Sequence, residues 1–245
     1  MTLGEAAILI GGGVAAGVVN TLAGGGSLLT VPLLVLVGLP GTVANGTNRI
    51  GILVQNATAA WRFRTLGVSG FAGAAPIVLP ICVGSLAGAA AVARIGDDTF
   101  ETLFGLLMLV VLVPTLRPPR VRAEGAKPWP RWLTAAVFFA IGLYGGAFQA
   151  GVGLLLVAAL AHAGLDLVRA NSVKAVVNCA LSAFAIPAFL LAGQIAWGPA
   201  LVLAGGFWAG GEIGARVAVH GGERVIRPAM AVAVVALAGR MLGLY

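Results

Sequence analysis

An internal repeat constrains the fold of this 245-residue chain more than any other feature. Residues 38–48 read GLPGTVANGTN, and 126 positions later residues 164–174 read GLDLVRANSVK. The same ungapped offset aligns residues 25–29 (GGSLL) with 151–155 (GVGLL), and it superposes Gly67, Gly84 and Gly88 on Gly193, Gly210 and Gly214. One offset that serves so many positions indicates two copies of one unit, a pattern typical of membrane transporters.

Composition indicates a helical membrane protein. The chain is 60% hydrophobic and only 9% charged, with a mean hydropathy of +1.03. Its apolar runs reach the roughly 20 helical residues that a hydrocarbon layer requires. The net charge of +7 does not indicate nucleic-acid binding, because the basic residues lie mainly in short loops between apolar segments.

The chain divides into two repeats of about five apolar segments each. Residues 1–116 form the first repeat, residues 117–131 a cytoplasmic linker rich in proline and charge, and residues 132–245 the second repeat. The expected segments are 4–22, 27–37, 42–61, 69–93 and 99–116, followed by 132–149, 153–163, 168–192, 196–219 and 225–243.

The second segment of each repeat is too short for a comfortable membrane crossing and follows a glycine-rich stretch. Because glycine tolerates non-helical backbone, we expect a helical hairpin that is broken inside the membrane. The exposed backbone at these breaks makes Gly25, Gly26, Ser27 and Gly151 candidate substrate-binding residues. Tight packing of helices through small residues is the alternative explanation.

The distribution of loop charges favours inverted repeats. An odd number of segments per repeat turns the second copy upside down, and a cytoplasmic linker then leaves most loop arginines on the cytoplasmic side as well. This prediction places both termini outside. All-α inverted repeats in a multi-pass protein of the cell inner membrane are therefore the expected architecture.

Arg49 and Lys174 are the most informative charges, because each lies some eight residues into an otherwise apolar helix. A charge at that depth needs a partner or an aqueous cavity. Hydrogen-bonding side chains surround them in sequence: Asn45, Thr47, Asn48, Asn171, Ser172 and Asn178. Two cations, amide donors and nearby helix breaks predict a binding site for a small anion. The alternative is that both cations extend to a membrane interface.

Three further side chains and one carboxylate complete the candidates. Gln55, Asn56 and Gln149 are weaker candidates for the site. Glu212 is the acid deep in a predicted span. Glu212 either forms an i,i+4 ion pair with Arg216, which we favour, or acts as a proton carrier.

The chain resembles the TauE/SafE sulfite exporter family, also called the four-toluene sulfonate uptake permeases. The resemblance rests on residues 23–34 (AGGGSLLTVPLL) and 38–48, and in the second copy on residues 149–153 (QAGVG) and 170–172 (ANS). It extends over almost the whole chain apart from the linker. It implies transport of sulfite or organosulfonates, commonly outward.

We therefore expect a secondary transporter that exports sulfite or a sulfonate such as sulfoacetate by alternating access between the repeats. An anion channel or uniporter is the alternative, and a membrane-embedded enzyme a more distant one. No metal or cofactor is expected, because no His/Cys cluster has ligand spacing and no glycine pattern has a phosphate-binding context. The expected partners are a small anion and the lipid bilayer, with a homodimer left open and no nucleic acid.

Overall fold

The computed structural model describes residues 1–116, 129–220, 235, 237–239 and 241–242 of the chain. The expected linker and most of the segment expected at 225–243 lie outside these residues. Within them, nine helices are assigned: α1 (Leu3–Ala23), α2 (Ser27–Leu36), α3 (Gly41–Thr65), α4 (Phe71–Val92), α5 (Asp97–Leu116), α6 (Arg131–Phe148), α7 (Val152–His162), α8 (Leu167–Leu191) and α9 (Trp197–Val219).

The helices confirm the all-α membrane class, and their bounds follow the internal repeat. Shifting α3 by 126 residues reproduces the bounds of α8, and the same shift brings α4 onto α9 to within one residue. In the part of the chain that the structure describes, four helices are long and apolar enough to cross a membrane: Leu3–Leu22, Phe71–Val92, Arg131–Phe148 and Leu167–Leu191. At about 1.5 Å per residue, α2 and α7 reach only about half of a hydrocarbon layer.

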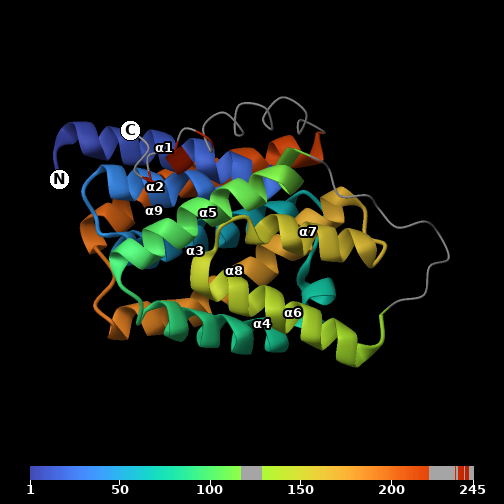
Figure 1. Ribbon diagram of the computed structural model, residues 1–245. Helices are drawn as coiled ribbons and strands as arrows, with labels where there is room; N and C mark the ends of the chain where they lie inside the picture. Colours follow the sequence, from blue (N-terminus) through green and yellow to red (C-terminus); the bar gives the residue numbers. More distant parts are fainter. Residues whose placement is uncertain (117–128, 221–234, 236, 240, 243–245) are drawn as a thin grey trace.

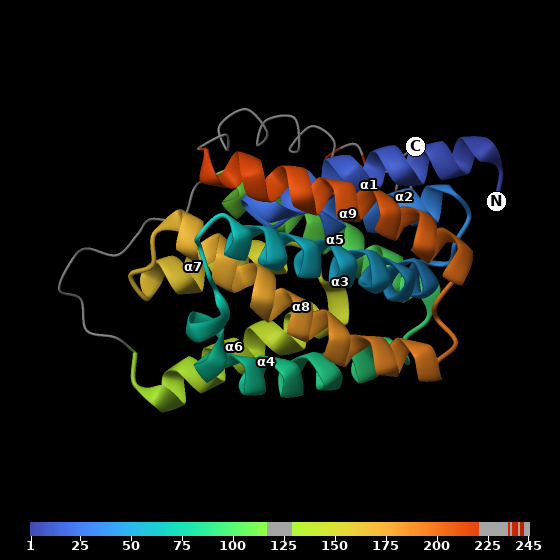
Figure 2. The ribbon, with the colours of Figure 1, turned by 180° about the vertical axis from the view of Figure 1, so that it is seen from behind.

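Six helices form a stack in which the two repeats alternate. Neighbours contact one another in the order α1, α9, α3, α8, α4 and α6. Figure 1 shows α1 and α9 along one edge and α4 and α6 along the opposite edge, and the reverse view in Figure 2 shows the same arrangement. When each helix is replaced by its equivalent in the other repeat, the same order is read backwards and every helix keeps equivalent neighbours. The two halves are therefore related by a pseudo-twofold axis that passes between α3 and α8.

Equivalent helices α3 and α8 run antiparallel. Gly46, near the start of α3, contacts Gln194 just beyond the end of α8. The reciprocal contact joins Ser172, near the start of α8, to the turn after α3, where its hydroxyl donates to the Val68 carbonyl at 2.8 Å. Such an antiparallel arrangement is what inverted repeats require.

The outer helix pairs pack through glycine. A Cβ at Gly17 of α1 would lie 2.9 Å from the Cα of Gly210 in α9. In the other pair, Gly84 and Gly88 of α4 contact the backbone of α6 at Phe139 and Leu143. Small residues let helix backbones approach closely, which is how helices associate in a membrane, where burial of apolar surface adds little.

Each short helix folds back on the helix before it. In the first repeat, Gly12 of α1 faces the side chain of Leu33 in α2, and Gly26 faces Ala16, so the two helices are antiparallel. Gly24 ends α1 in the left-handed conformation (φ 81°). In the second repeat Gln149 has this role after α6, with φ 60°, although it is not glycine. The expected helical hairpins with a break are therefore present.

Candidate functional site

The two hairpin breaks meet inside the molecule. Gly24 and Gly153 are so close that a Cβ on either would overlap the backbone of the other. The end of α1 and the start of α7 therefore lie side by side, and a buried cation binds the helix end that precedes each break: Lys174 at α1 and Arg49 at α6. Arg49 is 0% and Lys174 is 1% exposed, so the alternative in which they extend to an interface does not hold in this structure.

Arg49 binds the carboxyl end of α6. Its Nη1 donates to the Gly145 carbonyl at 2.6 Å and to Gln149 Oε1 at 2.5 Å. Its Nη2 donates to the carbonyls of Gly146 at 2.7 Å and Ala147 at 3.2 Å. Helix C-termini carry unpaired carbonyls and about half a negative charge, so this end of α6 stabilises a cation without a carboxylate.

Lys174 binds the carboxyl end of α1 in the same way. Its Nζ donates to the carbonyls of Asn20 at 2.8 Å and Thr21 at 2.7 Å, and to Asn171 Oδ1 at 2.7 Å. Those two carbonyls are the repeat equivalents of the Gly146 and Ala147 carbonyls. The two cations are not exact repeat equivalents, because Lys174 corresponds to Asn48 and not to Arg49. Each nevertheless binds the same helix end in the other repeat: Arg49 the end of α6, and Lys174 the end of α1.

Amide side chains extend the contacts of Arg49. Asn45 Nδ2 donates to the Ala147 carbonyl at 2.7 Å, and Gln149 Nε2 donates to Asn178 Oδ1 at 2.8 Å. The guanidinium also lies 5.2 Å from the centroid of the Phe189 ring, a cation–π distance. We refer to Asn45, Arg49, Gln149 and Asn178, which these hydrogen bonds connect, as the Arg49 cluster.

Two N–H donors of the Arg49 cluster have no acceptor. Within the described residues, Arg49 Nε and Asn178 Nδ2 are buried and without a hydrogen-bond partner. Buried polar groups are nearly always paired, so these two donors are the groups of the cluster that could bind an acceptor from outside the chain. Outside the cluster, Asn48 Nδ2, Arg62 Nε, Ser182 Oγ and the amide oxygens of Asn56 and Gln194 also lack a hydrogen bond.

The other candidates from the sequence are distributed around this centre. Asn171 contacts Lys174, and Asn48 accepts from Thr30 Oγ1 at 2.7 Å. Thr47 and Ser172 instead each bind a turn of the other repeat: Thr47 Oγ1 accepts from the Ala196 N–H at 2.9 Å, and Ser172 Oγ donates to the Val68 carbonyl. Gly25, Gly26, Ser27 and Gly151 lie at the breaks and are buried.

Sequence reasoning missed Asn20, Thr21 and Thr30. Gln55 connects the first two, since it accepts from Asn20 Nδ2 at 2.5 Å and donates to Thr21 Oγ1 at 2.6 Å. The available signal for Asn20 and Thr21 was two adjacent polar residues at the end of an apolar helix, separated from the triple glycine by Leu22 and Ala23.

Glu212 forms the expected ion pair with Arg216, at 2.7 Å. A second arginine, Arg62 from the end of α3, lies 3.3 Å from the same carboxylate oxygen. The Glu212 side chain is 26% exposed, so this three-residue cluster ties α3 to α9 away from the hairpin breaks. Its role in proton coupling stays a prediction.

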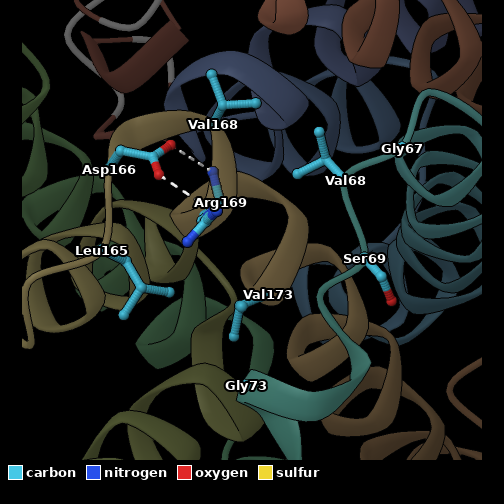
Figure 3. Close-up of a pocket in the computed structure, with 9 residues that line it drawn as sticks. All are labelled: Gly67, Val68, Ser69, Gly73, Leu165, Asp166, Val168, Arg169 and Val173. Atoms are coloured by element: carbon cyan, nitrogen blue, oxygen red, sulfur yellow. Dashed lines mark hydrogen bonds and ion pairs between the residues drawn. The ribbon is translucent and has the colours of Figure 1, made fainter.

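A pocket of about 520 Å³ opens between the turn after α3 and the start of α8. Figure 3 shows Asp166 and Arg169 paired at its edge, opposite Val68 and Ser69. None of the candidate anion-binding residues lines it. It lies on the face of α8 that carries Arg169 and Val173, whereas residues 171, 174 and 178 share a different face. The pocket is thus separate from the Arg49 cluster.

The fold and this buried polar centre define a polytopic helical membrane protein built from a duplicated unit. The chain belongs to the sulfite exporter TauE/SafE family, whose model matches residues 9–241. No solved structure matches the chain.

The chain is also similar to proteins named as probable membrane transporters. The chain is 28% identical over 225 residues to a probable membrane transporter protein of Haemophilus influenzae, covering 91% of this chain and 88% of that protein. It is 24% identical over 230 residues to the probable membrane transporter proteins ORF9 of Sinorhizobium sp and YfcA of Escherichia coli, covering 93% of this chain and 88% and 86% of those proteins. These matches support a membrane transporter.

Proposed function

We propose that this protein is a secondary transporter of the inner membrane that exports a small organosulfur anion, sulfite or a sulfonate such as sulfoacetate. The family description names sulfite export, and the relatives are named as transporters. The observation that carries the anion class is Arg49: its guanidinium is fully buried, and its hydrogen-bond acceptors among the described residues are carbonyl and amide oxygens.

A buried guanidinium without a carboxylate partner leaves net positive charge in a low-dielectric interior. The end of α6 offsets only part of that charge. An anion that binds next to Arg49 would balance the remainder and accept hydrogen bonds from the unpaired donors of the cluster.

The repeat arrangement supports alternating access. The antiparallel contact between α3 and α8 is the geometry in which two inverted halves can exchange conformations about a central site. Because α1 packs on α9 and α6 packs on α4, each outer pair contains one helix of each repeat. These pairs would move as units against the α3–α8 contact.

Counter-flow in proteoliposomes tests the proposal. Vesicles containing the purified protein and loaded with unlabelled sulfite should accumulate ³⁵S-sulfite transiently and saturably. A flux that rises linearly with concentration and shows no counter-flow would instead identify a channel. Chemical conversion of the sulfite by the protein would identify an enzyme.

A further inference from the structure

The end of α1 surrounds the Lys174 ammonium with oxygen atoms. The carbonyls of Asn20 and Thr21 accept hydrogen bonds from Nζ at 2.8 and 2.7 Å, and Asn171 Oδ1 accepts one at 2.7 Å. All four residues are at most 3% exposed. The three oxygens belong to neutral groups, and the carboxyl end of the helix adds about half a negative charge. Partial negative charge therefore converges on one buried point, which a single positive charge occupies.

The second repeat binds a cation at the same place but takes it from a different side chain. The equivalent carbonyls at the end of α6, those of Gly146 and Ala147, accept from the Arg49 guanidinium at 2.7 and 3.2 Å. Arg49 and Lys174 differ in chemical group and are not repeat equivalents. The feature that the two repeats share is therefore the pair of carbonyls that binds a cation, whichever side chain supplies it.

The oxygens at the end of α1 fit a monovalent cation. Calcium takes about six to eight oxygen ligands, carboxylates among them, and magnesium keeps several of its waters. Three neutral oxygens and about half a negative charge instead match one small, singly charged ion. In transporters with broken helices, backbone carbonyls and helix C-terminal ends are the groups that coordinate the coupling cation.

We infer that the end of α1 is a monovalent-cation site, which the Lys174 ammonium fills as a covalently attached cation in place of a free ion. Its ligands are the carbonyls of Asn20 and Thr21 and the side-chain oxygen of Asn171. Two consequences follow. Removing the lysine side chain opens the site to a free ammonium ion, and the unmodified protein requires no such ion.

Lys174→Ala keeps the three oxygens and removes their cation. Propylammonium is the first probe, because it replaces the atoms that the substitution removes, and ammonium replaces the charged group alone. For the full-length variant in detergent, either chloride should raise the melting temperature by at least about 3 °C over N-methylglucamine chloride at equal concentration. The unmodified protein should change by less than about 1 °C, because its site is filled. Equal melting temperatures of the variant in the three salts would overturn the site.

Two further variants of α8 separate this site from a general effect of the salts. Lys174→Met keeps the length of the side chain without its charge, so it leaves no space for a cation. It should melt below the unmodified protein by the same amount in all three salts. Leu181→Ala vacates a fully buried apolar position about two turns further along the helix and should not respond to either ammonium salt. A response of either control as large as that of Lys174→Ala would overturn the inference.

Aggregation of Lys174→Ala on extraction would itself supply a readout. The monodisperse fraction after solubilisation in each chloride then replaces the melting temperature. A larger fraction in propylammonium than in N-methylglucamine chloride supports the site, and equal fractions overturn it.

The consequence for transport rests on the proposed function. Because the cation is attached to the chain, ³⁵S-sulfite counter-flow by the unmodified protein should stay within twofold when N-methylglucamine replaces sodium on both sides of the vesicle membrane. Loss of counter-flow on this replacement would overturn the role of Lys174 as the substitute for a free ion. Absence of counter-flow in both salts would refute the proposed function, whereas the melting temperatures would still decide the cation site.

Discussion

At the residue scale, Arg49 and Lys174 show how the carboxyl end of a helix can stabilise a buried cation through its carbonyl oxygens. A charge at the centre of a bilayer costs at least about 2.5–3.5 kcal/mol on insertion scales. Here the carboxyl ends of α6 and α1 supply carbonyl oxygens at 2.6 to 3.2 Å. The same hydrogen bonds satisfy carbonyls that a helix end would otherwise leave unpaired, so cation and helix end stabilise each other.

Gln149 combines an unfavourable backbone with two buried hydrogen bonds, and Gln149→Gly separates these effects. Glycine removes the cost of a positive φ, about 1–2 kcal/mol. The substitution also removes the bonds to Arg49 and Asn178, worth together about 2–4 kcal/mol. We expect a net loss of about 1–3 kcal/mol in unfolding free energy, measured by denaturation in detergent. An unchanged or higher stability would show that Gln149 serves only the turn.

The carboxylate of Glu212 is placed for an ion pair, and a double variant tests whether it also carries protons. Joint replacement, Glu212→Gln with Arg216→Gln, removes both charges of this pair and also the carboxylate that lies 3.3 Å from Arg62. Because all three side chains are partly exposed to solvent, we expect a stability change below about 2 kcal/mol, from two ion pairs of up to about 1 kcal/mol each. We also expect pH-gradient-driven sulfite flux within twofold of the unmodified protein. Loss of that flux with counter-flow retained would identify Glu212 as the proton carrier.

At the element scale, the helices depend on glycine for two different purposes. At the breaks, Gly24 and Gly151 adopt positive φ (81° and 65°), which ends one helix and allows the next to begin. Within α1, α4, α6 and α9, glycines instead allow neighbouring backbones to touch. The second purpose accounts for the close pairing of α1 with α9 and of α4 with α6.

Gly210→Ala and Gly205→Ala compare a packed and an unpacked glycine within α9. A Cβ at Gly210 would lie 2.5 Å from the Val14 carbonyl oxygen, whereas one at Gly205 has no atom within 4 Å. We expect Gly210→Ala to destabilise the protein by about 1–3 kcal/mol through overpacking. Gly205→Ala should be neutral or stabilising by up to about 1 kcal/mol, because alanine favours helix. Thermal unfolding in detergent measures both, and equal effects would argue against the close α1–α9 contact.

At the scale of the whole molecule, the alternating stack makes each repeat dependent on the other. Helix α1 packs on α9 and α6 packs on α4, so neither repeat buries its own first helix. The two cations also bind across the repeats: Arg49 of the first repeat binds α6 of the second, and Lys174 of the second repeat binds α1 of the first. The molecule is thus two interleaved copies of one unit.

Cysteine labelling tests whether the copies are inverted across the membrane. Gly67 and Gly193 have positive φ, so the substitutions are better placed at the last helical residues, Thr65→Cys and Leu191→Cys, which are exposed repeat equivalents. In a background without Cys82 and Cys179, a membrane-impermeant reagent should label Thr65→Cys from the cytoplasmic side and Leu191→Cys from the outside. Labelling of both from one side would exclude inversion.

Much of the element pattern is local and could be predicted. Helix bounds follow from runs of apolar residues ended by glycine, proline or charge, which is why segments expected at 27–37 and 168–192 correspond to α2 and α8 within one residue. The sequence also predicts breaks at the triple glycine and at Gly151, because glycine tolerates non-helical backbone, but it does not predict the positive φ of Gln149. Burial of Arg49 and Lys174 followed from their depth in apolar helices.

Tertiary structure alone decided what these cations touch. Their carbonyl acceptors lie about 100 residues or more away in the chain, as in the bonds from Arg49 to Gly145 and from Lys174 to Asn20, and no local pattern encodes such a pairing. The same holds for Gln149, whose side chain matters because α3 and α8 bring Arg49 and Asn178 to either side of it. Periodicity and helix-ending residues act over a few neighbouring positions and are written in the sequence, whereas the packing of distant helices determines which donors are satisfied and which stay open to a ligand.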